Sequence, residues 1–127
     1  MFDARCLHDM SAEVFTLTDL QNWQSHSPAW ADADRPIVGV FGDPVAHSLS
    51  PQMMNPALEA IDVPGRYIRL HIREEEFSEA IRLLPKLGFV GTNVTIPHKF
   101  NALRNVDDVD ALAEKLGAVN TVVIDED

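Results

Sequence analysis

The sequence lacks the features that would direct it to nucleic acid, to a membrane or to an oxidising compartment. It has 10 basic against 20 acidic residues, a formal net charge of −10, whereas nucleic-acid and anionic-membrane binding depend on clustered lysine and arginine. No apolar run approaches the roughly 20 residues of a membrane-spanning helix. Cys6 is the single cysteine, which excludes an intramolecular disulfide framework and is typical of a reducing cytosol. We therefore expect a cytoplasmic protein without a nucleic-acid or membrane partner.

Metal and dinucleotide sites lack their usual sequence patterns as well. The six glycines include no G-x-G-x-x-G turn. The five histidines show no metal-binding spacing, because they are spread over His8, His26, His47, His71 and His98. We expect no metal site and no cofactor-binding residue in this chain.

The remaining composition is that of a globular domain. Hydrophobic residues make up 46% of the 127 positions and charged residues 24%, which suits one domain with a sizeable core. Residues 1–35 are expected to form an N-terminal extension or linker. A short helix is predicted within residues 15–23, capped by Thr18 or Asp19, and the Ser, Pro, Ala and Asp residues of 25–35 indicate a linker or an arm on the domain. Residues 36–127 are predicted to form the domain itself.

Strand and helix patterns alternate from residue 36 onwards. Strands are predicted over residues 37–41, 66–72, 90–96 and 119–124, and helices over residues 50–60, 74–87 and 100–116. This βαβαβαβ order predicts an α/β fold of three layers, α/β/α, with a mostly parallel sheet. In such sheets, ligands bind outside the carboxyl ends of the strands.

Local signals set the expected ends of these helices. Ser50 suits the N-cap of the first helix and Pro51 its first helical position. Gly117 is expected to end the last helix. The second part of that helical region is amphipathic, and its expected buried face consists of Val109, Leu112, Ala113 and Leu116.

Polar side chains gather where the first and third of these strands end. Pro97 stops the third strand, so Asn93, Thr95 and Lys99 follow one another at one rim. Lys99 is one of three lysines in the chain, and this arrangement suits a small hydroxylated molecule held beside a proton-transferring amine. After the first strand, Ser48 and Ser50 lie at a predicted helix N-terminus, which favours an anion.

Three segments together resemble the shikimate dehydrogenase family. They are Gly42–Pro51, Asn93–Lys99 and Gly117–Thr121, the last with the sequence Gly-Ala-Val-Asn-Thr. They occur in the family's order within residues 37–124. The resemblance implies the fold of the amino-acid-dehydrogenase-like N-terminal domain, which binds the substrate.

The resemblance also implies a role for each matching residue. Ser48 and Ser50 would bind the substrate carboxylate, and Asn93 and Thr95 the ring hydroxyls. Asn120 would be a further contact to the ring, and Lys99 the acid/base catalyst. Because Asn120 begins its strand whereas the other site residues end theirs, we predict that the last strand is antiparallel and brings its start to the same rim.

The chain departs from the family pattern in four respects. Met54 stands where the family usually has histidine, and Phe100 replaces a polar or acidic residue after the lysine. The glycine-rich NADP-binding domain of the family is absent from this chain, as is the aspartate that partners the lysine. His98 is expected to point away from the lysine.

We therefore predict the substrate-binding domain of a shikimate dehydrogenase. The full-length enzyme would reduce 3-dehydroshikimate to shikimate with NADPH in aromatic amino-acid biosynthesis, and the chain alone would be inactive without bound cofactor. Two alternatives remain: a quinate/shikimate dehydrogenase domain, with NAD as the cofactor, and a stand-alone module that binds hydroxy acids without chemistry. An unpaired sheet edge would favour a homo-oligomer.

Overall fold

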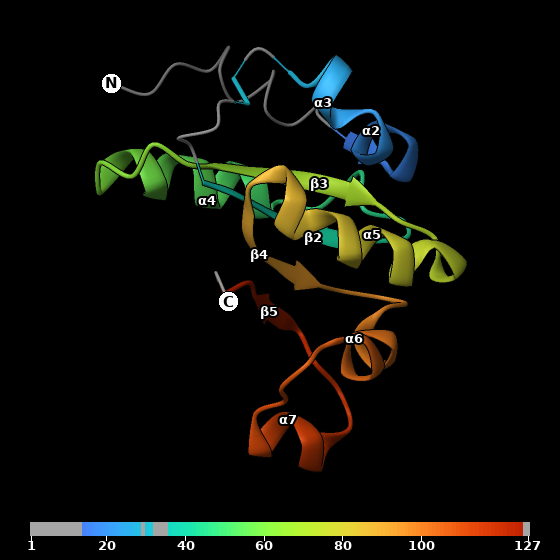
Figure 1. Cartoon of the computed structure of the whole chain (residues 1–127). Helices are drawn as coiled ribbons and strands as arrows, with labels where there is room; N and C mark the ends of the chain where they lie inside the picture. The colour runs from blue at the N-terminus through green and yellow to red at the C-terminus, as the bar shows by residue number, and fades with distance from the viewer. Residues whose placement is uncertain (1–13, 29, 32–35, 126–127) are drawn as a thin grey trace.

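The computed structural model describes residues 14–28, 30–31 and 36–125, and its centre is a five-stranded sheet (Figure 1). The sheet has the order β1-β3-β2-β4-β5. Its strands are β1 (Val14–Thr16), β2 (Ile37–Gly42), β3 (Arg66–His71), β4 (Phe89–Val94) and β5 (Thr121–Val123). β1 to β4 run parallel, and β5 pairs antiparallel with β4. The predicted mostly parallel sheet with an antiparallel last strand is confirmed.

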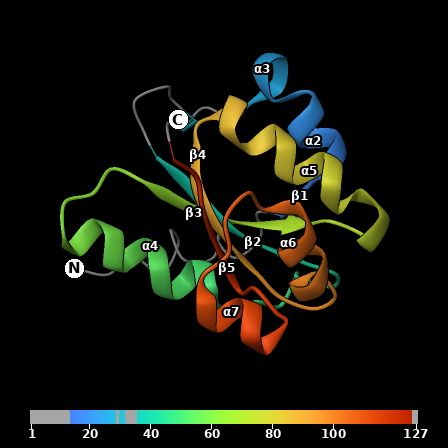
Figure 2. The ribbon, with the colours of Figure 1, turned by 60° about the horizontal axis from the view of Figure 1, so that its bottom comes forward.

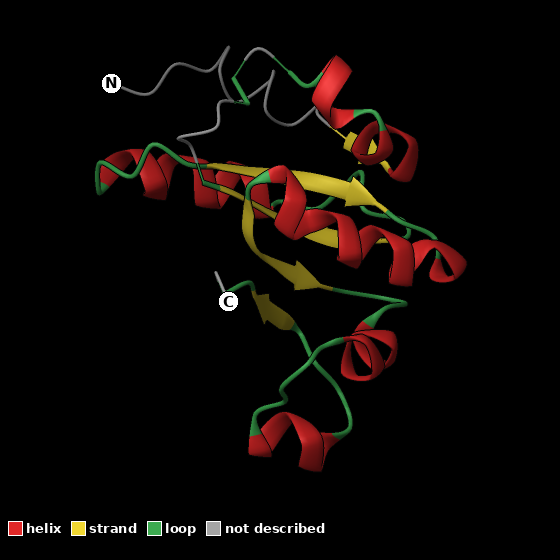
Figure 3. Cartoon of the chain, viewed as in Figure 1, coloured by secondary structure: helices red, strands yellow, loops and turns green. Residues whose placement is uncertain are grey.

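Helices cover both faces of the sheet, which gives the three predicted layers (Figures 2 and 3). One face carries α4 (Ser50–Ala60). The opposite face carries α2 (Leu17–Gln21), α3 (Trp23–His26), α5 (Phe77–Leu83) and α6 (Lys99–Asn105), whose buried side chains join one core cluster. The 3-10 turns η1 (Glu74–Glu76) and η2 (Leu84–Leu87) flank α5, and α7 (Ala111–Leu116) precedes β5.

The alternation of side chains along β3 divides the interior in two. Ile68 and Leu70 belong to the large core beneath α5, together with Phe41 and Phe77. Tyr67 belongs instead to a smaller cluster on the α4 face, where Val40 is its neighbour. Since successive side chains of a strand point to opposite faces, Arg69 also lies on the α4 side. This second face supplies the polar groups of the site.

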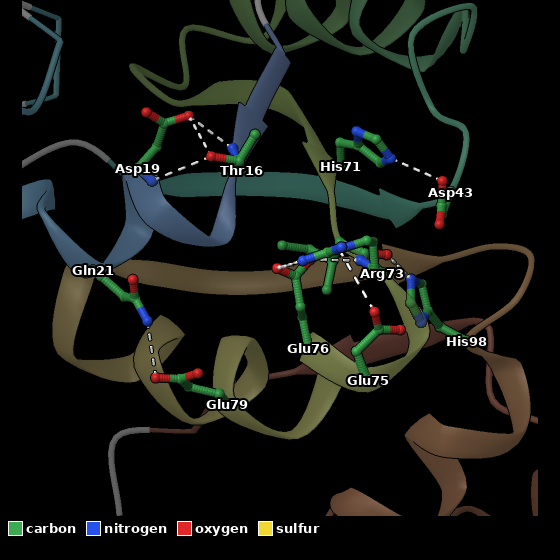
Figure 4. A network of polar contacts seen from close by, with 11 residues as sticks. Thr16, Asp19, Gln21, Asp43, His71, Arg73, Glu75, Glu76, Glu79 and His98 are labelled. Atoms are coloured by element: carbon green, nitrogen blue, oxygen red, sulfur yellow. Dashed lines mark hydrogen bonds and ion pairs between the residues drawn. The ribbon is translucent and has the colours of Figure 1, made fainter.

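The N-terminal segment differs from its prediction. Residues 14–16 form a strand that pairs with β3, and the helix begins at Leu17. Its N-cap is Thr16, whose hydroxyl accepts a hydrogen bond from the Asp19 N–H, so Thr18 and Asp19 are not the cap (Figure 4). Trp23 is 6% exposed and lies in the main core. Described residues of this segment therefore pack on the sheet, while the division of the chain at residue 35 stays a prediction.

The C-terminal helical region also differs from its prediction. Residues 100–116 form two helices instead of one, because Val106 takes an extended backbone conformation and ends α6. The Asp110 carboxylate then caps α7 by accepting from the Leu112 N–H. Val109 and Ala113 are half-buried and pack against the core, as predicted. Leu112 and Leu116 are 62% and 70% exposed, so the expected buried face is wrong for these two residues. Gly117 ends α7 with a positive φ of 74°, as predicted.

No described helix combines the length and the apolarity needed to cross a bilayer.

Candidate functional site

The carboxyl ends of β2 and β4 are hydrogen-bonded to each other at one edge of the sheet, which we call the rim. The Thr95 N–H donates to the Phe41 carbonyl across 2.9 Å. β5 reaches the same rim with its beginning, because it is antiparallel and pairs Asn93 with Thr121. The Asn120 carbonyl accepts from the Val94 N–H at 2.8 Å. The structure therefore brings the ends of two motifs, around Asn93 and Asn120, side by side.

The serine loop connects β2 with α4. The Ser48 hydroxyl oxygen accepts from the Ser50 N–H at 3.3 Å, and Ser48 and Ser50 are both half-buried. The N-cap position is Leu49, without a side-chain cap, and Ser50 is the first helical residue. The predicted N-cap role of Ser50 is therefore wrong by one position. Its hydroxyl lies near the Tyr67 phenol, whose pKa it lowers in part.

Two alternate side chains of β3, Arg69 and His71, hold this loop from the side of the sheet. Arg69 is 1% exposed. Its Nε donates to the Ser48 carbonyl at 2.9 Å, and Nη2 donates to Gln52 Oε1 at 3.0 Å. His71 Nε2 lies 2.8 Å from Asp43 Oδ1 at the start of the loop (Figure 4). Burial lowers the pKa of Arg69 from its usual 12.5, but a guanidinium stays charged in proteins. A positive charge is therefore fixed directly behind Ser48.

A chain of hydrogen bonds connects β3 with β4 and the start of β5. The Tyr67 hydroxyl donates to Asn93 Oδ1 at 2.7 Å. Asn93 Nδ2 donates to Thr121 Oγ1 at 3.0 Å, and Thr121 Oγ1 donates to Asn120 Oδ1 at 3.0 Å. We call Tyr67, Asn93, Thr121 and Asn120 the polar chain. It unites two of the predicted site residues, and Ser50 lies beside its Tyr67 end.

Lys99 lies beside this group as the first residue of α6. Its carbonyl accepts from the Val119 N–H at 3.1 Å, one residue before Asn120. The side chain is exposed, and Nζ has no hydrogen bond or ion pair within the described residues. The backbone of Lys99 is thus attached to the rim, while its amine remains in solvent.

His98 anchors the residue before Lys99 in the core. It is fully buried, stacks on Phe77 with 5.1 Å between ring centroids, and its Nε2 bonds the Ile72 carbonyl. Because a carbonyl only accepts, Nε2 carries the proton, and Nδ1 has no partner among the described residues. Burial lowers the pKa of His98, partly opposed by the bond to Ile72. His98 therefore points away from the exposed lysine, as predicted, and stays neutral.

Thr95 and Phe100 flank the lysine. Thr95 is half-buried, and a Cβ placed on Gly42 would lie only 2.7 Å from Thr95 Cγ2. Glycine at position 42 is thus required for the close approach of Thr95. Phe100 is 68% exposed, so the replacement of a polar residue here adds an exposed ring next to Lys99. Met54 is half-buried and packs against the cluster of Tyr67 on the α4 face.

The described residues offer no metal-binding cluster, and the sequence offers no dinucleotide-binding turn. Within the described residues, no three His, Cys, Asp or Glu side chains gather in one place. The whole sequence contains no G-x-G-x-x-G turn that could hold a pyrophosphate. We assign no cofactor-binding or metal-binding residue to this chain.

Sequence reasoning missed three polar residues of the site: Tyr67, Arg69 and Thr121. A signal for the first two existed, since Tyr67 and Arg69 alternate with the apolar Ile68 and Leu70 along one strand. Thr121 stood inside the recognised motif, but nothing in its spacing indicated a bond to Asn93. That bond depends on the antiparallel register of β5.

These features define a class of protein: an α/β ligand-binding domain whose rim suits a small hydroxylated acid. Comparison with known families makes the assignment specific. The family described as "Shikimate dehydrogenase substrate binding domain" matches residues 40–122. The chain belongs to this family.

Similar proteins agree with this assignment. The chain is 42% identical over 92 residues to a shikimate dehydrogenase (NADP(+)) of Ruegeria sp. (strain TM1040), covering 72% of this chain and 33% of the relative. A shikimate dehydrogenase structure from Aquifex aeolicus matches with a TM-score of 0.72 and 35% identity, over 75% of this chain and 36% of that one. The Thermus thermophilus enzyme, solved with NADP(H) and shikimate, matches with a TM-score of 0.67 and 38% identity, over 71% and 34%. The chain thus spans about a third of these proteins.

Proposed function

We propose that the rim binds shikimate and 3-dehydroshikimate, and that the chain is the substrate-binding part of an NADP-dependent shikimate dehydrogenase. The complete protein reduces 3-dehydroshikimate to shikimate. The polar chain is the observation that carries this proposal, because it joins residues of two family motifs at one rim, and Ser50 of the third motif lies beside it. The shikimate complex of the Thermus thermophilus relative supports the same ligand.

The proposed contacts follow the chemistry of a cyclic polyol acid. Ser48 and Ser50 donate to the carboxylate at the N-terminus of α4, with the positive charge of Arg69 behind them. Asn93, Thr95 and Asn120 hold the ring hydroxyls, for which amides and hydroxyls offer both donors and acceptors.

Lys99 is the proposed acid/base catalyst. Its ammonium group stabilises negative charge that develops on the oxygen of the carbonyl and supplies the proton to that oxygen. A nicotinamide cofactor supplies the hydride in such a reduction, and no residue of this chain is assigned to it. We therefore propose that the 127-residue chain alone is inactive.

Three further points complete the proposal. The acidic composition and the single Cys6 support a cytoplasmic location. β1 and β5 are the edges of the sheet, and an uncovered edge supports association into a homo-oligomer. The proposed family domain spans residues 36–127, and the described part of residues 1–35 adds β1, α2 and α3 to its sheet and core.

The test uses the product of the complete open reading frame. Oxidation of shikimate and of quinate is measured with NADP and with NAD, and we expect the highest kcat/KM for shikimate with NADP. A preference for quinate or NAD would establish the quinate/shikimate alternative. Saturable shikimate binding without turnover would establish a binding module, and the absence of both would refute the proposal.

A further inference from the structure

We infer that Tyr67 is a positioning residue that orients the Asn93 side chain for the ligand. The inference rests on the proposed function and deepens it. Tyr67 is the only tyrosine of the chain, and its hydroxyl donates to Asn93 Oδ1 at 2.7 Å. It is 3% exposed, so it acts through Asn93 without touching the ligand.

The topology explains why this position needs a long side chain. Tyr67 lies on β3 and Asn93 on β4, and β2 lies between the two strands. Two strand spacings amount to roughly 9.5 Å. A phenol spans this distance over the face of β2, whereas a serine or threonine hydroxyl at position 67 would not reach Asn93.

The bond from Tyr67 determines how the Asn93 amide is oriented. Oδ1 must face Tyr67, because the phenol donates to it, and Nδ2 must face Thr121, to whose oxygen it donates. One amide hydrogen and one oxygen lone pair remain for a ligand. A ring hydroxyl therefore meets a donor and an acceptor whose places are set before it binds, which reduces the ordering cost of binding.

The backbone of Tyr67 is itself held in place by a buried side chain. Asn55 Nδ2 donates to the Tyr67 carbonyl at 3.0 Å, and the Tyr67 N–H donates to Asn55 Oδ1 at 2.8 Å. Burial raises the pKa of Tyr67 above its usual 10.0, with the Ser50 bond lowering it in part. Tyr67 thus remains a neutral donor over the working range of the site.

Tyr67→Phe in the product of the complete reading frame tests the inference, since the ring is kept and only the hydroxyl is lost. We expect KM for shikimate to rise about 5- to 10-fold, the usual effect of one lost hydrogen bond, and kcat to change by less than about twofold. The split follows because the affected groups grip the ligand equally in ground and transition states. Ser78→Ala is the control. It removes a hydroxyl that bonds Asn105 Oδ1 between α5 and α6, away from Asn93, and should leave KM unchanged.

A spectroscopic measurement tests the orientation of Asn93 separately from the effect on ligand binding. In the ¹H–¹⁵N spectrum of the ligand-free protein, Tyr67→Phe should shift the Asn93 side-chain amide signals, and Ser78→Ala should shift them less. Unchanged Asn93 signals, or an unchanged KM in a variant of an active protein, would overturn the role of Tyr67. A wild-type protein that neither binds nor oxidises shikimate would instead refute the proposed function, and with it the ligand part of the inference.

Discussion

The serine loop and the Lys99 segment meet at one rim but are held in different ways. Buried Arg69 holds the loop, because it donates to the Ser48 carbonyl and to Gln52 Oε1. The Lys99 segment is held through its backbone and through His98, while the amine of Lys99 lies in solvent. The loop proposed to bind the ligand is therefore held by a buried side chain, and the group proposed to move a proton is exposed.

The difference has a physical reason. A grip that is already ordered loses little entropy when a ligand binds. A catalytic amine must instead adjust to the position of the reacting oxygen, because its catalytic hydrogen bond forms fully only in the bound state. The two regions should consequently respond differently to substitution.

The largest effect is expected from Lys99→Ala. In the product of the complete reading frame, turnover should fall about 10²- to 10⁴-fold, the range of general acid/base catalysis, while shikimate affinity changes far less. Lys115→Ala, at the exposed end of α7, is the control and should keep full turnover. Equal turnover in the Lys99 variant would show that the lysine side of the rim has no catalytic role.

A smaller effect is expected from Arg69→Met, measured by urea unfolding. The variant leaves the Ser48 carbonyl and Gln52 Oε1 without their buried donor. We expect a loss of about 1–3 kcal/mol in the free energy of unfolding. Arg73→Met is the matched control, because Arg73 is 62% exposed and surface ion pairs contribute about 0–1 kcal/mol. Equal losses in both variants would remove the distinction between the two regions.

His98 allows a test by pH. Its folded-state pKa lies below the ordinary 6.5. In the pH range between these two values the unfolded chain therefore binds more protons than the folded chain. Its contribution to stability is therefore complete above about pH 6.5 and is lost as the pH falls below that value. His98→Gln cannot titrate, and the pH dependence of unfolding should become shallower between pH 7 and pH 5. An identical slope in both proteins would contradict a buried neutral imidazole.

The smallest effect is expected from Leu116→Ser on α7. Leu116 is 70% exposed, and exposed substitutions usually change the free energy of unfolding by less than about 0.5 kcal/mol. Leu84→Ala is the buried counterpart at 0% exposure, with an expected loss of about 2–5 kcal/mol. A large loss in the Leu116 variant would indicate that Leu116 is buried, as the sequence pattern had suggested.

Sequence reasoning located the rim well because its signals are local. Ser48, Ser50, Asn93 and Lys99 stand next to strand ends, and an alternating βα order sends parallel strand ends to one edge. The antiparallel direction of β5 also followed, from the position of Asn120 at the start of its strand. Whether these residues bind the substrate stays a prediction.

Long-range pairing was beyond the reach of such signals. β1 is three residues long and owes its strand form to its pairing with β3. The break between α6 and α7 likewise left Leu112 and Leu116, which were expected to be buried, exposed to solvent. Both outcomes depend on neighbours distant in the chain, which local periodicity does not record.

The order of residues alone determined the alternation of strands and helices, the motifs at the strand ends and the family, because each follows from a few neighbouring side chains. Only the tertiary structure decided that Tyr67 bridges β3 and β4 over β2, and that Arg69 lies behind Ser48. Those contacts join residues 26 and 21 positions apart, and they exist only once the sheet has set its strand order and register.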